Sequence, residues 1–136
     1  MRTPRALLLA TLLALTTAGC GGGTRVYPAA GTDVSPAASG DIRVGKTEGA
    51  QMVDVDLRHL APPGRLGTGL SQYAVWVVPE GLPPMLAGIL AYDTAQQSGR
   101  LRATTPYERF DVIVTAEAEP IGSQPSGVVV VRRSVP

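Results

Sequence analysis

The chain has 136 residues, and its 12 lysines and arginines nearly balance its 11 aspartates and glutamates, for a net charge of +1 at pH 7. A chain this close to neutral lacks the basic surface that nucleic-acid binding requires, so we expect no nucleic-acid partner. The length suits one domain of typical size rather than two. Because the chain has a single cysteine, it cannot form an internal disulfide.

The first 19 residues have the pattern of a secretory signal peptide. Arg2 and Arg5 make the start positive, and the uncharged run 6–18, rich in alanine and leucine, follows them. This run is too short to span a bilayer, because an apolar helix needs roughly 20 residues to do so. We therefore predict a helical signal peptide over residues 1–19 that is removed from the mature protein.

The only cysteine of the chain, Cys20, directly follows small residues. The run Thr17-Ala18-Gly19-Cys20 resembles the lipobox of bacterial lipoprotein precursors, which reads Leu-Ala/Ser/Thr-Gly/Ala-Cys, with Thr17 in place of the preferred leucine. The resemblance implies cleavage between Gly19 and Cys20, a thioether-linked diacylglycerol on Cys20 and usually an N-acyl chain. The alternative is an ordinary signal-peptidase site beside a free thiol, which is unusual for an oxidising compartment.

An acylated Cys20 predicts a protein of the cell envelope that is held on a membrane. Two or more acyl chains anchor a protein stably, whereas one chain binds only marginally. Gly21 stands where aspartate would retain the protein at the inner membrane, under the enterobacterial sorting rule that this motif resembles. This favours the outer membrane, if the organism has one.

Residues 20–40 have the composition of a flexible spacer. Glycine and proline recur among alanine, serine and threonine without a hydrophobic period, and such a segment does not repay its ordering entropy. We predict a disordered tether over residues 20–40 and a globular domain over residues 41–136. The alternative is that residues 24–27 pair as a short strand at the edge of the domain.

From residue 41 onward the hydrophobic period is two, which indicates strands with one face in the core. Residues 42–44 and 53–57 alternate in this way, whereas residues 73–78 are apolar in both registers. The latter pattern predicts a central strand in a sheet that is covered on both faces.

Further strands are expected over residues 85–92, 101–104, 109–117 and 128–132, with turns rich in glycine and proline between them. Apolar residues at helical spacing with a plausible cap are lacking in the mature chain. About seven short strands predict an all-β fold, an immunoglobulin-like antiparallel β-sandwich, with a small barrel as the main alternative.

Segments 73–76, 110–117 and 124–130, with the strand around Gly88, are similar to the extracytoplasmic C-terminal domain of anti-sigma-K-type factors. The similarity lies in a Tyr-x-x-Trp strand, a Phe-led strand that ends near Glu-Pro, and a Pro-Thr-Gly turn, here Pro125-Ser126-Gly127. The resemblance implies the sandwich fold. It does not carry over anti-sigma activity, because this sequence lacks the helical sigma-binding domain and the transmembrane helix of those proteins.

Residues that could carry catalysis or bind a metal are scarce. His59 is the only histidine and Cys20 is assigned to lipid, which excludes a zinc site on ligand count. A lone histidine at a strand end is usually a solvated or capping residue. None of the serines lies in a nucleophile-elbow pattern, and His59 is the one possible base. These serines are Ser71, Ser98, Ser123, Ser126 and Ser134.

Two groups of side chains on the predicted strands have a second possible role. Asp54 and Asp56 share an outward face, as Glu117 and Glu119 would if their strand continued, and clustered carboxylates could hold calcium. We expect them instead to pair across strands with Arg100, Arg102 or Arg109. The aromatic residues could form a ligand platform, but their spacing favours the core. These residues are Tyr73, Trp76 and Phe110.

These patterns together predict a membrane-tethered cell-envelope lipoprotein that is not an enzyme and needs no cofactor or metal. Its sandwich would bind or scaffold another envelope component, either a protein or a glycan. The alternative is a lipid-anchored sensory or regulatory module related to the anti-sigma extracytoplasmic domain.

Overall fold

A computed structural model describes residues 22–136 of the chain. Nine strands and one 3-10 helix, Pro63–Arg65, make up its regular structure, and these residues contain no α-helix. The strands are β1 (Arg25–Ala30), β2 (Ser39–Thr47), β3 (Ala50–Arg58), β4 (Gln72–Pro79), β5 (Met85–Ile89), β6 (Ala91–Asp93), β7 (Ser98–Thr105), β8 (Phe110–Glu117) and β9 (Val128–Val135).

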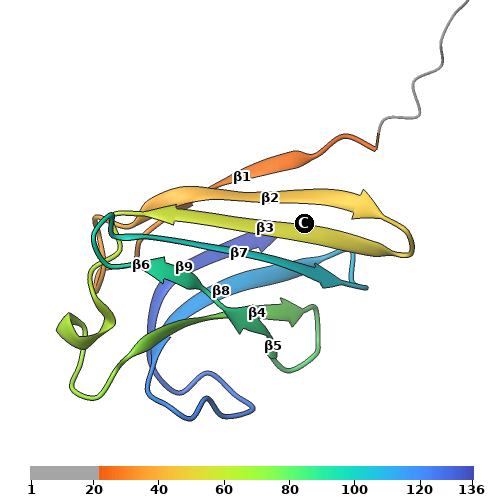
Figure 1. The fold of residues 1–136 in the computed structure, drawn as a ribbon. Coiled ribbons are helices and arrows are strands. Elements are labelled where there is room, and N and C mark those ends of the chain that lie inside the picture. Colours follow the sequence, from red (N-terminus) through yellow and green to blue (C-terminus); the bar gives the residue numbers. More distant parts are fainter. Residues whose placement is uncertain (1–21) are drawn as a thin grey trace, which may run out of the picture.

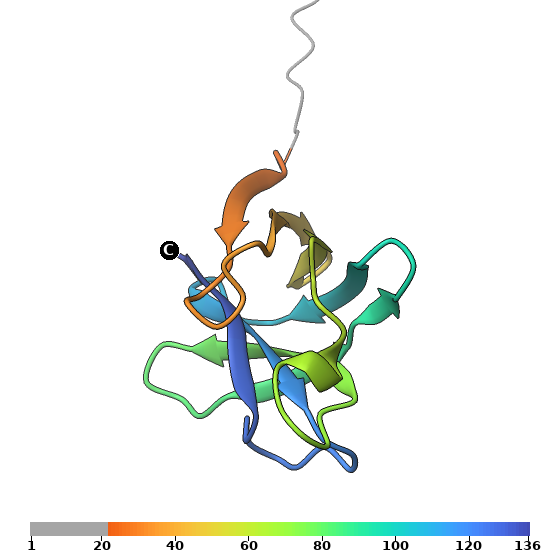
Figure 2. The same ribbon diagram turned by 90° about the vertical axis from the view of Figure 1, so that its left-hand side faces the viewer.

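The strands form two antiparallel sheets that lie face to face (Figure 1). The five-stranded sheet has the order β1-β2-β3-β7-β6, and the four-stranded sheet has the order β5-β4-β8-β9. Figure 2, turned by 90°, shows the same two layers from the end that carries the 3-10 helix. The predicted all-β class is confirmed and the arrangement is consistent with a β-sandwich, with nine strands rather than about seven. The immunoglobulin-like topology stays a prediction.

The alternating strands bury their apolar residues between the two sheets, as predicted. In β3 the side chains of Val53, Val55 and Leu57 are buried, and those between them face solvent. The inner residues of β2, β8 and β9 meet them in one continuous core. Period-two patterning therefore fixes which face of each strand turns inward.

Strand β4 is buried on both faces, which confirms its prediction as a central strand covered on two sides. Tyr73, Val75 and Val77 face the core between the sheets. Ala74 and Trp76 face the other side, where Trp76 is fully buried in a second, smaller cluster with Ile113 of β8. The four-stranded sheet therefore has a second apolar area on its outer face, around Trp76, that must also be covered.

The predicted disordered tether over residues 20–40 is wrong for the part that the structure describes from Arg25 onward. Residues 25–30 pair with β2 along their whole length, which agrees with the alternative of an edge strand, although that alternative covered residues 24–27. The connection that follows is tied to β9, since the Thr32 amide and hydroxyl donate to the carbonyls of Val130 and Val129, at 2.9 and 2.7 Å. These long-range bonds order a segment whose local composition favours disorder.

The strand predicted over residues 85–92 is two strands in different sheets. β5 pairs with β4, and β6 pairs with β7 of the opposite sheet. Leu90 lies between them, buried, with its amide bonded to the Tyr73 carbonyl at 2.8 Å. A Cβ at Gly99 of β7 would collide with the Leu90 side chain, so any larger residue there would force Leu90 to shift where the chain crosses between the sheets.

We predict that Thr32→Val lowers the free energy of unfolding by about 1 kcal/mol, because it removes one partly buried hydrogen bond to β9. Urea unfolding of the mature chain measures the loss. Thr68→Val, at an exposed position, is the matched control and should change nothing. Equal stability of the two variants would contradict the ordered connection after β1.

Candidate functional site

The predicted lipobox residues lie outside the described part of the chain. These residues are Thr17, Ala18, Gly19 and Cys20, and the described residues begin at Gly22. The structure therefore bears on the surfaces of the domain, and two of these stand out: the outer face of the five-stranded sheet and the outer face of the four-stranded sheet.

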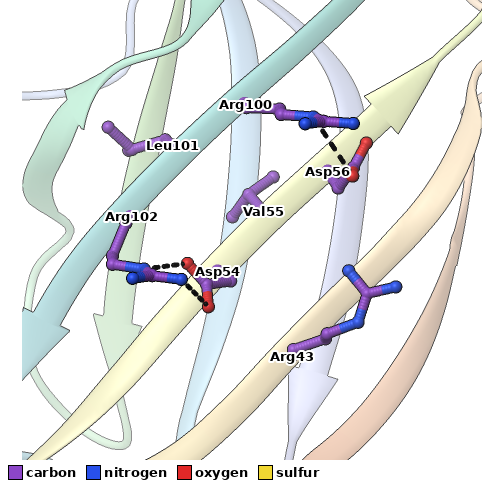
Figure 3. A pocket seen from close by; sticks show the side chains of 7 residues that line it. All are labelled: Arg43, Asp54, Val55, Asp56, Arg100, Leu101 and Arg102. Carbon is purple, nitrogen blue, oxygen red and sulfur yellow. Dashed lines mark hydrogen bonds and ion pairs between the residues drawn. The ribbon is translucent and has the colours of Figure 1, made fainter.

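The outer face of the five-stranded sheet carries a cluster of ion pairs around a shallow depression of about 440 Å³ (Figure 3). Arg102 of β7 donates two hydrogen bonds to the carboxylate of Asp54 of β3, from Nε at 2.6 Å and from Nη2 at 3.1 Å. Arg100 Nε lies 3.3 Å from Asp56 Oδ2 in a single ion-pair contact. Arg43 of β2 lies on the other side of the two carboxylates.

These ion pairs confirm the predicted pairing of Asp54 with Arg102 and of Asp56 with Arg100. Arg109 pairs with Glu80 instead, at 3.3 Å. Each of the two carboxylates is neutralised by a cross-strand partner. Among residues 22–136, no three carboxylate, histidine or cysteine side chains gather as metal ligands would. Exposed ion pairs of this kind contribute little to stability.

The outer face of the four-stranded sheet is apolar near β4 and is covered by the loop 118–127. Ile121 of this loop packs against the cluster of Ala74, Trp76 and Ile113. The sheet alone would leave an indole ring and an isoleucine side chain in water, so burying them favours the loop in this position.

A buried chain of hydrogen bonds fastens this loop to the sheet. The Trp76 indole Nε1 donates to the Thr115 hydroxyl at 2.9 Å, and that hydroxyl donates to Glu117 Oε1 at 2.6 Å. Ser126 of the loop completes the chain, since its amide donates to Oε1 at 3.1 Å and its hydroxyl donates to Oε2 at 2.8 Å. The Glu117 side chain is 1% exposed.

The hydrogen bonds keep the Glu117 carboxyl ionised despite its burial. Burial alone would raise the pKa of Glu117, but the bonds from Thr115 and Ser126, and from the backbone of Gly127 and Ser126, outweigh it. The pKa of Glu117 therefore lies below its ordinary value of 4.5. A charge-assisted network of this kind is among the stronger hydrogen-bond arrangements in proteins.

The expectation that Glu117 shares an outward, solvated face with Glu119 is wrong. Glu119 is exposed, whereas Glu117 lies beneath the loop. The face of β8 that carries Glu117 is turned away from the core, but the loop 118–127 covers it. Thr115, Glu117 and Ser126 are the residues that sequence reasoning missed as a network. The outer register of β8 holds one apolar residue, Ile113, so the pattern of this strand gives no clear signal that the face is covered.

The aromatic residues are buried, which confirms the prediction that they belong to the core. Tyr73 and Phe110 lie between the sheets, and Trp76 lies under the loop. The Tyr73 hydroxyl donates to the Ala61 carbonyl at 2.5 Å, and burial raises the pKa of Tyr73 to about 12. His59 directly follows β3 and has a positive φ of 57°. Its Nδ1 lies 3.3 Å from the Ser39 hydroxyl, at the surface.

A shallow groove of about 610 Å³ lies between β5 and the start of the loop 118–127. Its lining is mostly apolar, with one amide and one carboxylate. The lining residues are Gln72, Leu86, Ile89, Glu119, Pro120 and Ile121. Leu86 and Ile89 are 45% and 41% exposed, so this groove presents large apolar side chains to solvent. We refer to it as the β5 groove.

Comparisons with protein-family models, with curated proteins and with solved structures give no significant match to this chain. The resemblances to lipoprotein precursors and to anti-sigma-K-type domains therefore stay predictions from the sequence.

Within residues 22–136, no helix is long and apolar enough to cross a bilayer.

We predict that Glu117→Gln lowers the free energy of unfolding by about 2 kcal/mol at pH 7, because the amide loses charge-assisted bonds in a buried site. The folded chain holds the pKa of Glu117 below its ordinary value, so the ionised group stabilises the fold above about pH 4.5. This contribution is lost as pH falls through the folded pKa.

Urea unfolding at several pH values tests this prediction, with Glu119→Gln as the exposed control. The difference between wild type and Glu117→Gln should shrink below pH 4.5, whereas the control should match wild type throughout. A difference that does not depend on pH would contradict the role of the charge.

Proposed function

We propose that this protein is a lipoprotein of the bacterial cell envelope, tethered to a membrane by lipid on Cys20, with a non-catalytic β-sandwich that binds an envelope partner. The observation that carries the proposal is the position of the lipobox-like run 17–20, at the end of an uncharged apolar segment, with only four residues between Cys20 and the start of β1. Gly21 supports the outer membrane as the destination.

The described surfaces support a binding role rather than catalysis. His59 lies at the surface, and its hydrogen-bond partner is Ser39. In residues 22–136, every buried side-chain nitrogen and oxygen has a hydrogen-bond partner. The buried polar groups are thus used within the fold.

The β5 groove is the surface best suited to a protein partner. It joins exposed apolar side chains to β5, an edge strand that pairs only with β4. Edge strands offer unpaired backbone groups to a second extended chain. A glycan is less well matched, because none of the six lining residues is aromatic and only two carry polar side chains. We therefore assign an extended, apolar segment of an envelope protein to this groove.

A regulatory module related to the anti-sigma extracytoplasmic domain is the second candidate. The observation in its favour is that the segments carrying the resemblance lie in β4, in β8, and in the loop with β9. Trp76, Glu117 and Ser126 of those segments belong to one buried network. An envelope-stress response that changes on deletion would support this role, and an unchanged transcriptome would argue against it.

Metabolic labelling with palmitate tests the anchor. Wild type should incorporate the label and fractionate with membranes, whereas Cys20→Ser should do neither, because the sulfur that carries the lipid is gone. Equal incorporation by the two chains would overturn the lipoprotein proposal.

Photo-crosslinking tests the groove. A benzophenone amino acid at Leu86 should give an adduct with one envelope protein in intact cells, and Ile89→Asp in the same chain should abolish it. Val26, which is 53% exposed and lies on β1 of the other sheet, is the control position. Equal adducts from both positions, or an adduct that survives Ile89→Asp, would contradict the assigned surface.

A further inference from the structure

The chain enters the domain at one particular end of the sandwich. Arg25 pairs with Val44 near the end of β2, so β1 starts beside the β2–β3 turn. Thr105 pairs with Gln51, and Phe110 pairs with Pro79, which puts the β7–β8 and β4–β5 loops at this end as well (Figure 1). We call the start of β1 with these turns the proximal end. The distal end carries the connections 31–38, 59–71, 94–97 and 118–127.

The segment between the lipobox and β1 is short. Residues 21–24 separate Cys20 from Arg25. A chain spans at most about 3.6 Å per residue, so Arg25 lies no farther than about 18 Å from a lipidated Cys20. β3 alone has nine residues and extends the sandwich by about 30 Å at 3.3 Å per residue. An anchored domain therefore keeps its proximal end near the bilayer and can hold its distal end away from it.

The proximal end carries exposed apolar side chains with no excess charge. Leu82 and Met85, at the β4–β5 loop, are 44% and 39% exposed, and Val26 beside the entry of the chain is 53% exposed. The ionised side chains of this end comprise three basic and three acidic groups. These are Arg25, Lys46 and Arg109, and Glu48, Glu80 and Glu108. Contact with lipid would thus depend on apolar burial and not on attraction to anionic headgroups.

We propose that the proximal end rests on the phospholipid headgroup layer, with Leu82 and the β4–β5 loop at the lipid surface and the distal loops turned away from it. This inference depends on the proposed acylation of Cys20. It adds an orientation: the β5 groove, which the distal loop 118–127 lines in part, then lies on the flank of the four-stranded sheet away from the bilayer, where a neighbouring envelope protein can reach it.

Fluorescence quenching in vesicles tests the orientation. Because lipid occupies the only native cysteine, an introduced cysteine is the only free thiol of the lipidated protein. Leu82→Cys and Val34→Cys are matched variants, since the native side chains are 44% and 51% exposed at opposite ends. Each purified lipidated variant is labelled with a nitrobenzoxadiazole dye and placed in phosphatidylcholine vesicles with or without a headgroup nitroxide.

We expect quenching at position 82 to exceed that at position 34 by at least about twofold, because the two positions differ in depth by nearly the length of the sandwich. Adding anionic lipid should leave the contrast unchanged. Equal quenching, or stronger quenching at position 34, would overturn the proposed orientation.

Flotation of the unlabelled protein separates this result from a failure of the proposed function. Wild type should float with the vesicles and Cys20→Ser should not. Protein that stays out of the vesicle fraction, without lipid on Cys20, would overturn both proposals. Lipidated protein that floats but shows no contrast between the two positions would overturn the orientation alone.

Discussion

Strand β4, at the centre of the four-stranded sheet, is apolar on both of its faces, and the rest of the structure depends on how these two faces are covered. The five-stranded sheet covers the inner face, with Tyr73, Val75 and Val77 of β4 in the shared core. Within residues 22–136, no second layer of regular structure covers the outer face, and the loop 118–127 takes its place. Trp76 is fully buried, and Ile121 of this loop packs against its cluster together with Val78 and Val129 of the sheet.

A loop covers an apolar surface stably only if its backbone is held in one position. The buried carboxylate of Glu117 holds this loop through its hydrogen bonds to Ser126. Burying a charge is unfavourable by itself, but the donors of Thr115 and Ser126 offset the cost. The charged group thus links the end of β8 to the last turn before β9. The β5 groove lies along the rim of this cover, where the loop leaves Leu86 and Ile89 partly in water.

Most of the fold could be predicted from the sequence, because hydrophobic alternation records which side of a strand is buried. The apolar residues in both registers of β4 also predicted that both faces of this strand would be covered. Two features escaped prediction because non-local contacts decide them. β1 is ordered by β2 and β9 despite a spacer-like composition. Leu90 carries the chain from one sheet to the other within what looked like a single strand.

The candidate site was less accessible to sequence reasoning than the fold. The pairing of Asp54 and Asp56 with arginines could be predicted from strand periodicity. The period of two puts both carboxylates on the outer face, where residues of the neighbouring strand lie directly opposite them. The burial of Glu117 depends instead on where a glycine- and proline-rich loop settles, and alternation along β8 does not contain that information. The β5 groove is likewise made by two segments that are 30 residues apart in the sequence, between Ile89 and Glu119.

Mechanical load would enter an anchored form of this domain through β1. A pull between the membrane and a partner acts on Arg25 along the direction of the strand, and six residue pairs join β1 to β2. Antiparallel interstrand bonds lie perpendicular to the strands, so a force along β1 strains all of them together in shear instead of opening them one after another. β1, which the sequence predicted to be part of a disordered tether, is thus paired in the geometry that best resists a pull from the lipid anchor.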